Sequence, residues 1–232
     1  MSLDDSTGFL TRRSTGGNIS RIVNLAKQLA LPLPFRGGKR RCAGRPPKGD
    51  KALVSHAPRP RFARPTPAHV TLRMDNELPG LRSSRRFAIV SGCFEKSRGK
   101  LGLRLVEFSV LGNHLHLIVE ADSSAALSRG MQGLCIRIAK ALNAALDRSG
   151  RVFADHYHSR LLLTPTEVAS TIAYVLDNAA RHYDRHSNED CFSSTTLELR
   201  RLLALPRCWL LTVGWKRARP NALRALGRFY DV

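Results

Sequence analysis

The sequence predicts an α+β fold in which an antiparallel sheet carries packed helices on one face, in a ferredoxin-like or split βαβ layout. Three observations predict it. Segments with strand-like alternation and helix-like periodicity follow each other in the order β-α-β-β-α-β-α between residues 69 and 182. A short turn at residues 111–113 joins two alternating segments as a hairpin. Hydrophobic residues make up 43% of the 232 residues, which is enough for a packed core.

The first strand and the first helix come from residues 69–96. Residues 69–73 (H-V-T-L-R) alternate and include β-branched side chains, which predicts a strand. Residues 83–96 carry apolar side chains at helical spacing, with Ser83 or Ser84 as the N-cap. The apolar residues of this helix are Phe87, Val90 and Phe94.

The hairpin contains an unusual strand with two histidines. Residues 104–111 alternate and are expected to place Val106, Phe108 and Val110 on one face. The returning strand reads H-L-H-L-I-V-E from residue 114 to residue 120. Since side chains alternate along a strand, one face carries His114, His116, Ile118 and Glu120, and the core face carries Leu115, Leu117 and Val119.

Two further helices flank a last strand. Ser123 and Ser124 cap a long helix that is expected to end near Ser149, before Gly150. Its apolar stripe is Leu127, Met131, Leu134, Ile138, Leu142 and Leu146. Residues 152–163 are strand-like, and residues 164–167 (T-P-T-E) form a capping box with proline at the first helical position. The helix that follows runs to about residue 182, with a core stripe of Val168, Ile172, Val175 and Ala179.

The charge indicates a polyanionic partner. Lys and Arg number 38 against 18 Asp and Glu, which gives a formal net charge of +20, so nucleic acid is the expected partner. The sequence divides into a basic, Pro- and Gly-rich arm (residues 1–65), a folded domain (66–185) and a basic C-terminal extension (186–232). Five cysteines without C-x-x-C spacing argue against a zinc ribbon or disulfide framework. No apolar run reaches the roughly 18 residues of a membrane-spanning helix.

The candidate chemistry lies on the histidine strand and the last helix. His114 and His116 stand about 7 Å apart on one face, estimated from the strand rise, and two neutral imidazoles can bind one divalent cation. The alternative is a pair of half-buried structural histidines. Tyr174, Asn178 and Arg181 follow at i, i+4 and i+7 along one flank of the helix, where an ordinary boundary face is the alternative.

Together these residues resemble the HUH single-tyrosine transposases of the insertion-sequence type, in particular the REP-associated tyrosine transposases. The resemblance rests on the H-L-H motif at residues 114–116 and on a later helix that bears Tyr174 and Asn178. Further similar stretches are residues 44–48, 69–73, 112–117, 150–158 and 174–178, together with the tryptophan segments at 209–211 and 214–215. The resemblance covers about residues 44–217 and implies an HUH endonuclease fold.

The resemblance also implies a mechanism. His114 and His116, with Asn178 as the third ligand, would hold Mg²⁺ or Mn²⁺ at a phosphate of single-stranded, hairpin-associated DNA. Tyr174 would then cleave the strand and leave a 5′-phosphotyrosine and a free 3′-OH. DNA-binding residues would be Arg45, Lys48, Arg137, Lys140 and Arg181. Such an enzyme would be a monomer or homodimer in the bacterial cytoplasm, near the nucleoid.

Several alternatives remain open at this level. Tyr157 is a rival nucleophile within the ligand-like run at residues 155–158, and Glu120 is a rival ligand on the histidine face. A non-catalytic binder of DNA or RNA hairpins would share the fold, and RRM-type RNA-binding modules share its element order. Relaxases and replication initiators use the same HUH chemistry on longer domains.

Overall fold

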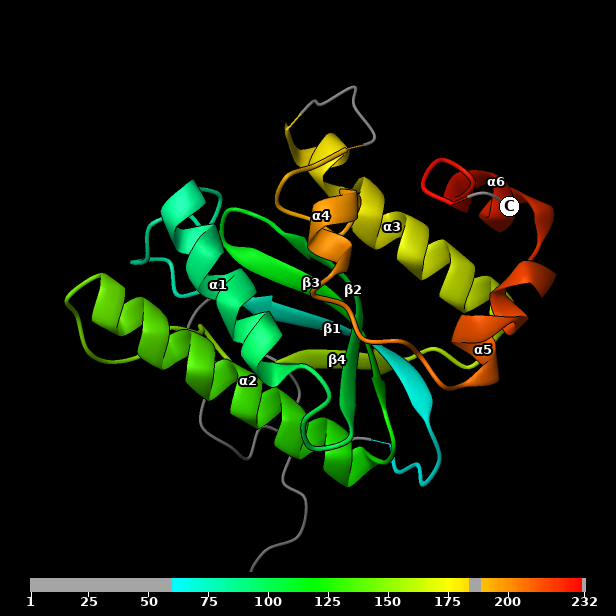
Figure 1. Ribbon diagram of the computed structural model, residues 1–232, viewed down its shortest axis with the longest axis horizontal. Coiled ribbons are helices and arrows are strands. Elements are labelled where there is room, and N and C mark those ends of the chain that lie inside the picture. Colours follow the sequence, from blue (N-terminus) through cyan, green and yellow to red (C-terminus); the bar gives the residue numbers. More distant parts are fainter. Residues whose placement is uncertain (1–59, 184–188, 231–232) are drawn as a thin grey trace, which may run out of the picture. The chain divides into compact units, whose positions relative to one another are not determined.

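The computed structural model describes residues 60–183 and 189–230, so most of the predicted arm, including Arg45 and Lys48, lies outside the described residues. The domain elements are β1 (Thr66–Arg73), α1 (Ser84–Ser97), β2 (Leu103–Val110), β3 (His114–Ala121), α2 (Ser124–Ala145), β4 (His158–Leu161) and α3 (Pro165–Tyr183). The strands form an antiparallel sheet in the order β2-β3-β1-β4 (Figure 1). The predicted α+β, ferredoxin-like fold is confirmed.

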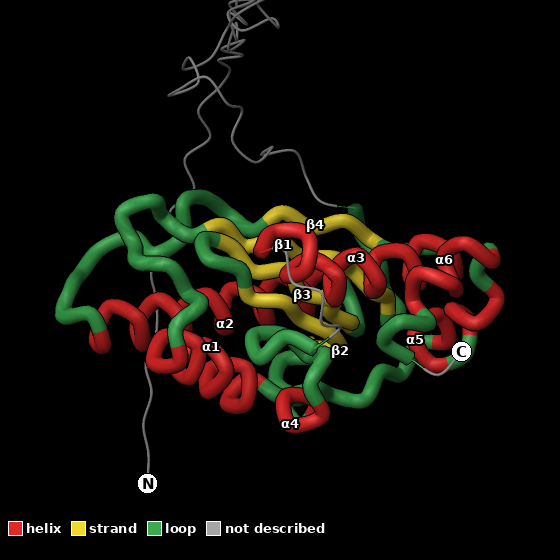
Figure 2. Tube along the Cα trace, turned by 90° about the horizontal axis from the view of Figure 1, so that it is seen from above, coloured by secondary structure: helices red, strands yellow, loops and turns green. Residues whose placement is uncertain are grey.

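The sheet is covered on both faces rather than on one. The first hydrophobic cluster joins α1 and α2 to one face through Phe94, Met131 and Leu117. The second cluster packs the Val168, Ile172 and Val175 stripe of α3 against Ile118 of β3 on the other face. The expectation of helices on a single face is therefore wrong for α3. Figure 2 shows the strands with helices on either side.

A β-bulge in β2 changes which of its side chains share a face, compared with the sequence prediction. The register of β2 on β3 shifts between Leu105 and Glu107, so that Val106 is the extra residue. Phe108 and Val110 lie in the cluster under α1 and α2, whereas Val106 lies in the cluster under α3. The simple alternation that the sequence predicts for these three residues is wrong, because one inserted residue exchanges the two faces.

Two predicted boundaries also differ. Helix α2 begins after its N-cap Ser123, as expected, but ends at Ala145 instead of near Ser149. Asp147 has a φ of 49°, a conformation that a helix does not continue through. The predicted strand at residues 152–163 is reduced to β4 and to one isolated bridge between Met74 and Phe153, because the chain between them leaves the sheet as a loop.

The C-terminal part of the chain packs against the sheet and α3. Residues 190–204 follow the free edge of β2, with backbone hydrogen bonds such as Val110 N–H to the Phe192 carbonyl at 2.9 Å. This pairing protects an edge strand. Beyond it lie α4 (Leu197–Arg200), α5 (Trp209–Thr212), η1 (Gly214–Arg217) and α6 (Pro220–Leu226), of which α5, η1 and α6 pack on α3. Among the described residues, no helix is long and apolar enough to cross a membrane.

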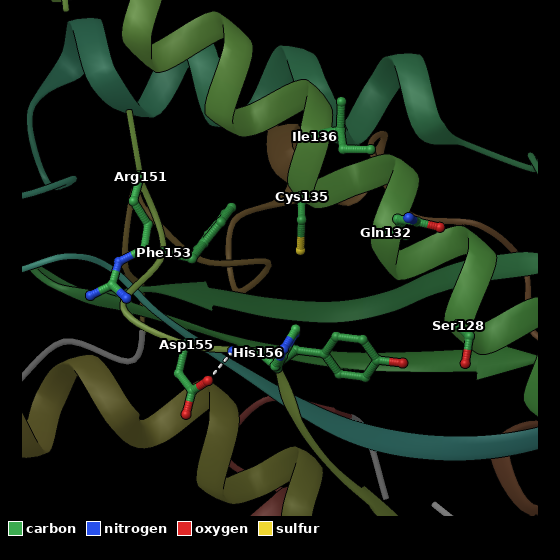
Figure 3. Close-up of a pocket in the computed structure, with 9 residues that line it drawn as sticks. Ser128, Gln132, Cys135, Ile136, Arg151, Phe153, Asp155 and His156 are labelled. Atoms are coloured by element: carbon green, nitrogen blue, oxygen red, sulfur yellow. Dashed lines mark hydrogen bonds between the residues drawn. The ribbon is translucent and has the colours of Figure 1, made fainter. Parts of the chain in front are cut away.

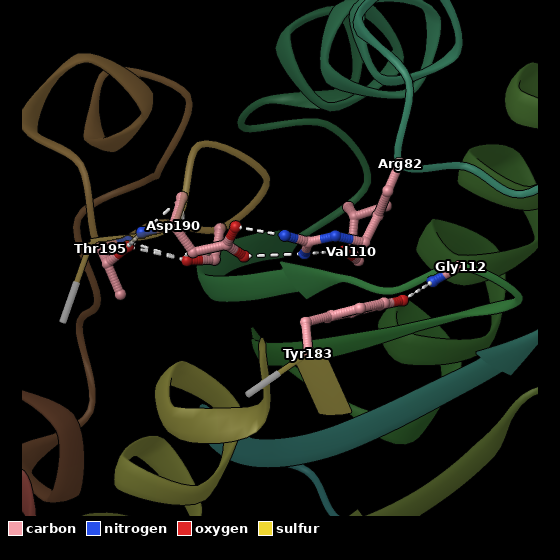
Figure 4. A network of polar contacts seen from close by, with 7 residues as sticks. Arg82, Val110, Gly112, Tyr183, Asp190 and Thr195 are labelled. Carbon is pink, nitrogen blue, oxygen red and sulfur yellow. Dashed lines mark hydrogen bonds and ion pairs between the residues drawn. The ribbon is translucent and has the colours of Figure 1, made fainter. Parts of the chain in front are cut away.

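A polar network fastens the C-terminal end of α3 to the hairpin turn that precedes His114 (Figure 4). The hydroxyl of Tyr183 accepts a hydrogen bond from the backbone N–H of Gly112 at 2.8 Å. The guanidinium of Arg82 lies 4.4 Å from the centre of the Tyr183 ring and donates two hydrogen bonds to Asp190, at 2.9 and 2.5 Å. A further hydrogen bond of 3.0 Å reaches the carbonyl of Val110.

The contribution of the Tyr183 hydrogen bond to stability can be measured by removing one oxygen atom. We expect Tyr183→Phe to lower the free energy of unfolding by about 0.5–1.5 kcal/mol, because the Gly112 N–H loses its partner while the ring stays under Arg82. Urea denaturation of both proteins measures the difference. An unchanged midpoint would mean that water replaces the tyrosine hydroxyl without loss.

Candidate active site

The histidine strand faces α3. His116 is buried at 6% exposure and His114 is half-buried, and their ring centres lie 4.9 Å apart. Their alternate neighbours Leu115 and Leu117 are fully buried under α1 and α2. The predicted facing of β3 is confirmed, and the two imidazoles lie on the same side of the sheet as the predicted tyrosine helix.

Strand β1 adds a third imidazole, His69, which the sequence motifs do not single out. Thr71 is the cross-strand partner of His116, and His69 lies two residues away on the same face. His69 Nε2 lies 3.0 Å from His116 Nδ1, and Thr71 Oγ1 lies 3.3 Å from the same atom. The two rings stack with their centres 5.1 Å apart. The alternation of residues 69–73 contained the signal, but it did not tell which strand would lie beside β3.

Helix α3 presents three residues to this face at i, i+4 and i+8. The ring of Tyr174 meets that of His116 edge-on at 5.6 Å, and the ring of His182 meets that of His114 at 5.8 Å. Asn178 lies between them on the helix and is 1% exposed. Tyr174 is 37% exposed, so it borders both the histidines and solvent. The structure therefore brings the four predicted residues His114, His116, Tyr174 and Asn178 to one site.

The start of α3 forms as predicted. Thr164 Oγ1 accepts a hydrogen bond from the Glu167 N–H at 3.2 Å, and Glu167 Oε2 accepts one from the Thr164 N–H at 3.1 Å. This capping box fixes where the helix begins, and with it the angular position of every later side chain. The predicted core stripe is buried, which turns Tyr174 and Asn178 toward the histidine face.

Arg181 lies beside the tyrosine and is held by a carboxylate. Its guanidinium is 5.7 Å from the centre of the Tyr174 ring, and its Nε donates to Asp177 Oδ2 at 2.8 Å. Arg228 reaches the other oxygen of Asp177 at 3.3 Å. Arg181 is thus held beside Tyr174, where its guanidinium could contact a phosphate bound at the phenol.

The three histidines on the sheet, His69, His114 and His116, are neutral at ordinary pH. Burial, with His69, His114 and His182 nearby, lowers the pKa of His116 to about 3. Burial, with Arg160 and His158 nearby, lowers the pKa of His69 to about 4. Burial and the proximity of His182 also lower the pKa of His114. A neutral imidazole keeps a lone pair for a metal ion, which a protonated ring does not.

The depressed pKa values predict an acid-dependent loss of stability in the metal-free protein. Below pH 6.5 the unfolded chain protonates His69 and His116, whereas in the folded chain these two histidines stay neutral until the pH falls to about 4 and about 3, respectively. The free energy of unfolding is therefore highest above pH 6.5 and declines as the pH falls, by about 1.4 kcal/mol per pH unit for each of these two histidines. Urea denaturation between pH 7 and pH 4 should show that the free energy of unfolding changes less steeply with pH in His116→Gln than in the parent. The same pH dependence of the unfolding free energy in both proteins would contradict the burial of His116.

The residues that could hold a divalent ion are His114, His116 and Asn178, and phosphate or water oxygens would have to complete the coordination. Among the described residues, no group of three or more His, Cys, Asp or Glu side chains is arranged to hold a metal ion, so the two histidines would need ligands of another kind, such as an amide oxygen, a phosphate oxygen or water. Asn178 is a buried amide on this flank of α3 whose Nδ2 has no hydrogen-bond partner, and its side-chain oxygen is the atom that could bind an ion. His114 Nδ1 lies 2.8 Å from the Asn113 side-chain oxygen, which orients that ring and leaves Nε2 for a ligand.

Glu120 is not available as a ligand. It is fully buried, accepts hydrogen bonds from the backbone N–H groups of Arg207 and Cys208 at 2.9 and 2.7 Å, and pairs with Arg104 at 2.5 Å. Burial alone raises the pKa of Glu120, but these hydrogen bonds outweigh it and hold the pKa below its usual value. The interpretation of Glu120 as a substitute ligand is therefore wrong, because its oxygens anchor the C-terminal segment.

Tyr157 lies on the opposite side of the sheet from the histidine pair. It is 9% exposed and belongs to the hydrophobic cluster under α1 and α2. Together with Asp155, His156 and Phe153 it borders a pocket of about 600 Å³ against α2 (Figure 3). Asp155 Oδ1 accepts a hydrogen bond from the His156 N–H at 2.7 Å. Tyr174 is thus the tyrosine that meets the histidines, and Tyr157 is not.

The remaining predicted DNA-binding residues lie elsewhere. Arg137 and Lys140 are on α2, on the other face of the sheet. Arg137 donates to Ser97 Oγ at 3.1 Å and so links α2 to α1, while Lys140 is exposed. The structure does not bring these two residues to the histidine site.

Comparison with solved structures identifies the fold. A REP-associated tyrosine transposase bound to a REP hairpin matches 66% of this chain and 89% of its own, with a TM-score of 0.53 and 14% sequence identity. This chain has the fold of a REP-associated tyrosine transposase. The transposase fold predicted from the sequence motifs is thereby confirmed.

Other comparisons are weaker or empty. A candidate transposase from Deinococcus radiodurans R1 matches 52% of this chain and 91% of its own, with a TM-score of 0.38 and 13% identity. No protein-family model matches the chain, and no curated protein matches it in sequence.

Proposed function

We propose that the protein is a transposase-like enzyme that nicks and rejoins single-stranded, hairpin-associated DNA through a covalent tyrosine intermediate. The observation that carries the proposal is the contact of the partly exposed Tyr174 ring with buried His116, at 5.6 Å, in a site that also contains His114 and Asn178. Packing alone does not require two imidazoles, a buried amide and a solvent-facing phenol in one place.

His114, His116 and Asn178 are the residues that would hold Mg²⁺ or Mn²⁺. When bound, the ion would act as a Lewis acid on the scissile phosphate. The histidines contribute neutral nitrogen donors on a rigid strand, and Asn178 contributes an amide from the packed face of α3. Because β3 and α3 are joined by the second hydrophobic cluster, their relative position is set before DNA arrives.

Tyr174 would be the nucleophile. Its phenolic oxygen loses a proton to solvent, forms a bond to phosphorus and displaces the 3′-oxygen, which takes up a proton as the free 3′-OH. The product is a 5′-phosphotyrosine. Attack of a 3′-OH on that phosphorus reverses the step and rejoins the strand, so no nucleotide cofactor is consumed. Arg181 would bind the phosphate through its guanidinium.

The substrate assignment rests on charge and on the fold. A net charge of +20 favours a polyanion, and the protein with the similar fold is bound to a REP hairpin. The basic arm and the C-terminal extension would add salt-sensitive phosphate contacts. The mechanism is compatible with a monomer or a homodimer, because Tyr174 faces the histidines of its own chain. We expect the enzyme in the bacterial cytoplasm, at the nucleoid.

The test is a denaturing gel of labelled single-stranded hairpin oligonucleotides incubated with the protein. With Mn²⁺ we expect an SDS-stable protein–DNA adduct and a shortened strand that carries a 3′-OH, and with EDTA neither product. Binding of a broad hairpin panel without cleavage under any metal would overturn the enzymatic proposal and support a hairpin-binding protein of the same fold.

A further inference from the structure

His69 contacts both the candidate metal ligand His116 and the candidate nucleophile Tyr174. Neither the sequence motifs nor the proposed function assigns His69 a role. Its Nε2 lies 3.0 Å from His116 Nδ1, and its ring meets that of Tyr174 edge-on at 6.1 Å. It lies on β1, the strand that pairs with β3 along the whole length of both. The contact is therefore fixed by the sheet and not by a loop.

The hydrogen bond has a consequence for the other nitrogen of His116. Two neutral imidazoles that share one hydrogen bond must be one donor and one acceptor. If His116 Nδ1 carries the proton and donates it to His69 Nε2, then His116 Nε2 is bare and can bind a ligand. In the reverse arrangement His69 is the donor, and the proton of His116 sits on Nε2 and blocks it.

We infer that His69 is a positioning residue, which accepts a hydrogen bond from His116 Nδ1–H and so keeps His116 Nε2 free for a divalent ion. The inference rests on the proposed function insofar as the ion is concerned. Partners of this kind orient metal-binding histidines in other proteins, and their loss commonly weakens metal binding by 10–100-fold. Thr71 Oγ1 at 3.3 Å is the longer contact to the same atom and a natural comparison.

The experiment compares four full-length proteins: the parent, His69→Phe, His69→Gln and Thr71→Val. Phenylalanine keeps a ring against His116 but cannot accept the hydrogen bond, whereas the glutamine carbonyl can. The protonated nitrogen of His116 is read from ¹H–¹⁵N correlation spectra of the imidazole rings in the metal-free proteins. Mn²⁺ affinity is measured separately by calorimetry, and circular dichroism confirms that each variant is folded.

We expect His116 to carry its proton on Nδ1 in the parent, in His69→Gln and in Thr71→Val, and to shift toward the Nε2–H form in His69→Phe. Mn²⁺ should bind His69→Phe about 10–100-fold more weakly than the parent, with His69→Gln near the parent. An Nε2–H form in the parent, or an unchanged form in His69→Phe, would overturn the inference. If the parent binds no Mn²⁺, the proposed function loses its metal, while the tautomer spectra still decide the role of His69.

Discussion

Tyr174→Phe is expected to lower DNA cleavage by at least about 10³-fold and to abolish the covalent adduct, because a phenyl ring has no oxygen to bond to phosphorus. The ring itself should remain against His116, so binding of the hairpin should change little. Since Tyr174 is 37% exposed, the variant should also fold as the parent does. Single-turnover cleavage on a denaturing gel measures the loss, and a gel-shift assay measures binding.

Tyr157→Phe is the matched control. Tyr157 lies under α2 on the opposite face of the sheet. The Tyr157→Phe protein should therefore form the same adduct and cleave DNA at the same rate as the parent. An adduct that survives in Tyr174→Phe and disappears in Tyr157→Phe would move the nucleophile to the other face. Such a result would also mean that His114 and His116 take no part in DNA cleavage.

Much of the site follows from local periodicity. The two-residue repeat of β3 puts His114 and His116 on the face away from Leu115 and Leu117, and the helical repeat of α3 puts Tyr174 and Asn178 on one flank. The capping box fixes the start of that helix. These are short-range features, which is why the sequence predicts them correctly.

The rest depends on long-range contacts that no local pattern contains. The stacking of His69 on His116 depends on which strand lies beside β3, and the approach of His182 to His114 depends on where α3 crosses the sheet. The bulge at Val106 is set by pairing between β2 and β3. Glu120 shares the histidine face, yet it differs from the histidines because the C-terminal segment returns to it from 87 residues away.

Glu120→Ala is expected to lower the free energy of unfolding by about 3–5 kcal/mol, the usual cost of removing one partner of a buried ion pair. The change leaves the guanidinium of Arg104, whose side chain is 7% exposed, without its buried carboxylate. It also leaves the N–H groups of Arg207 and Cys208 without an acceptor. Urea denaturation at pH 7 measures the loss. Asp122→Ala is the control, because Asp122 pairs with the same arginine but its side chain is 43% exposed.

The pH dependence of this effect distinguishes an anchor from a ligand. The pKa of Glu120 is held below its usual value of 4.5, so its stabilisation is complete above that pH and is lost as the pH falls through the depressed value. The difference between parent and Glu120→Ala should therefore be constant from pH 8 to about pH 5 and shrink in stronger acid. Mn²⁺ affinity should be unaffected in the folded variant. A stable Glu120→Ala protein that no longer binds Mn²⁺ would instead make Glu120 a ligand, and the C-terminal segment would need another anchor.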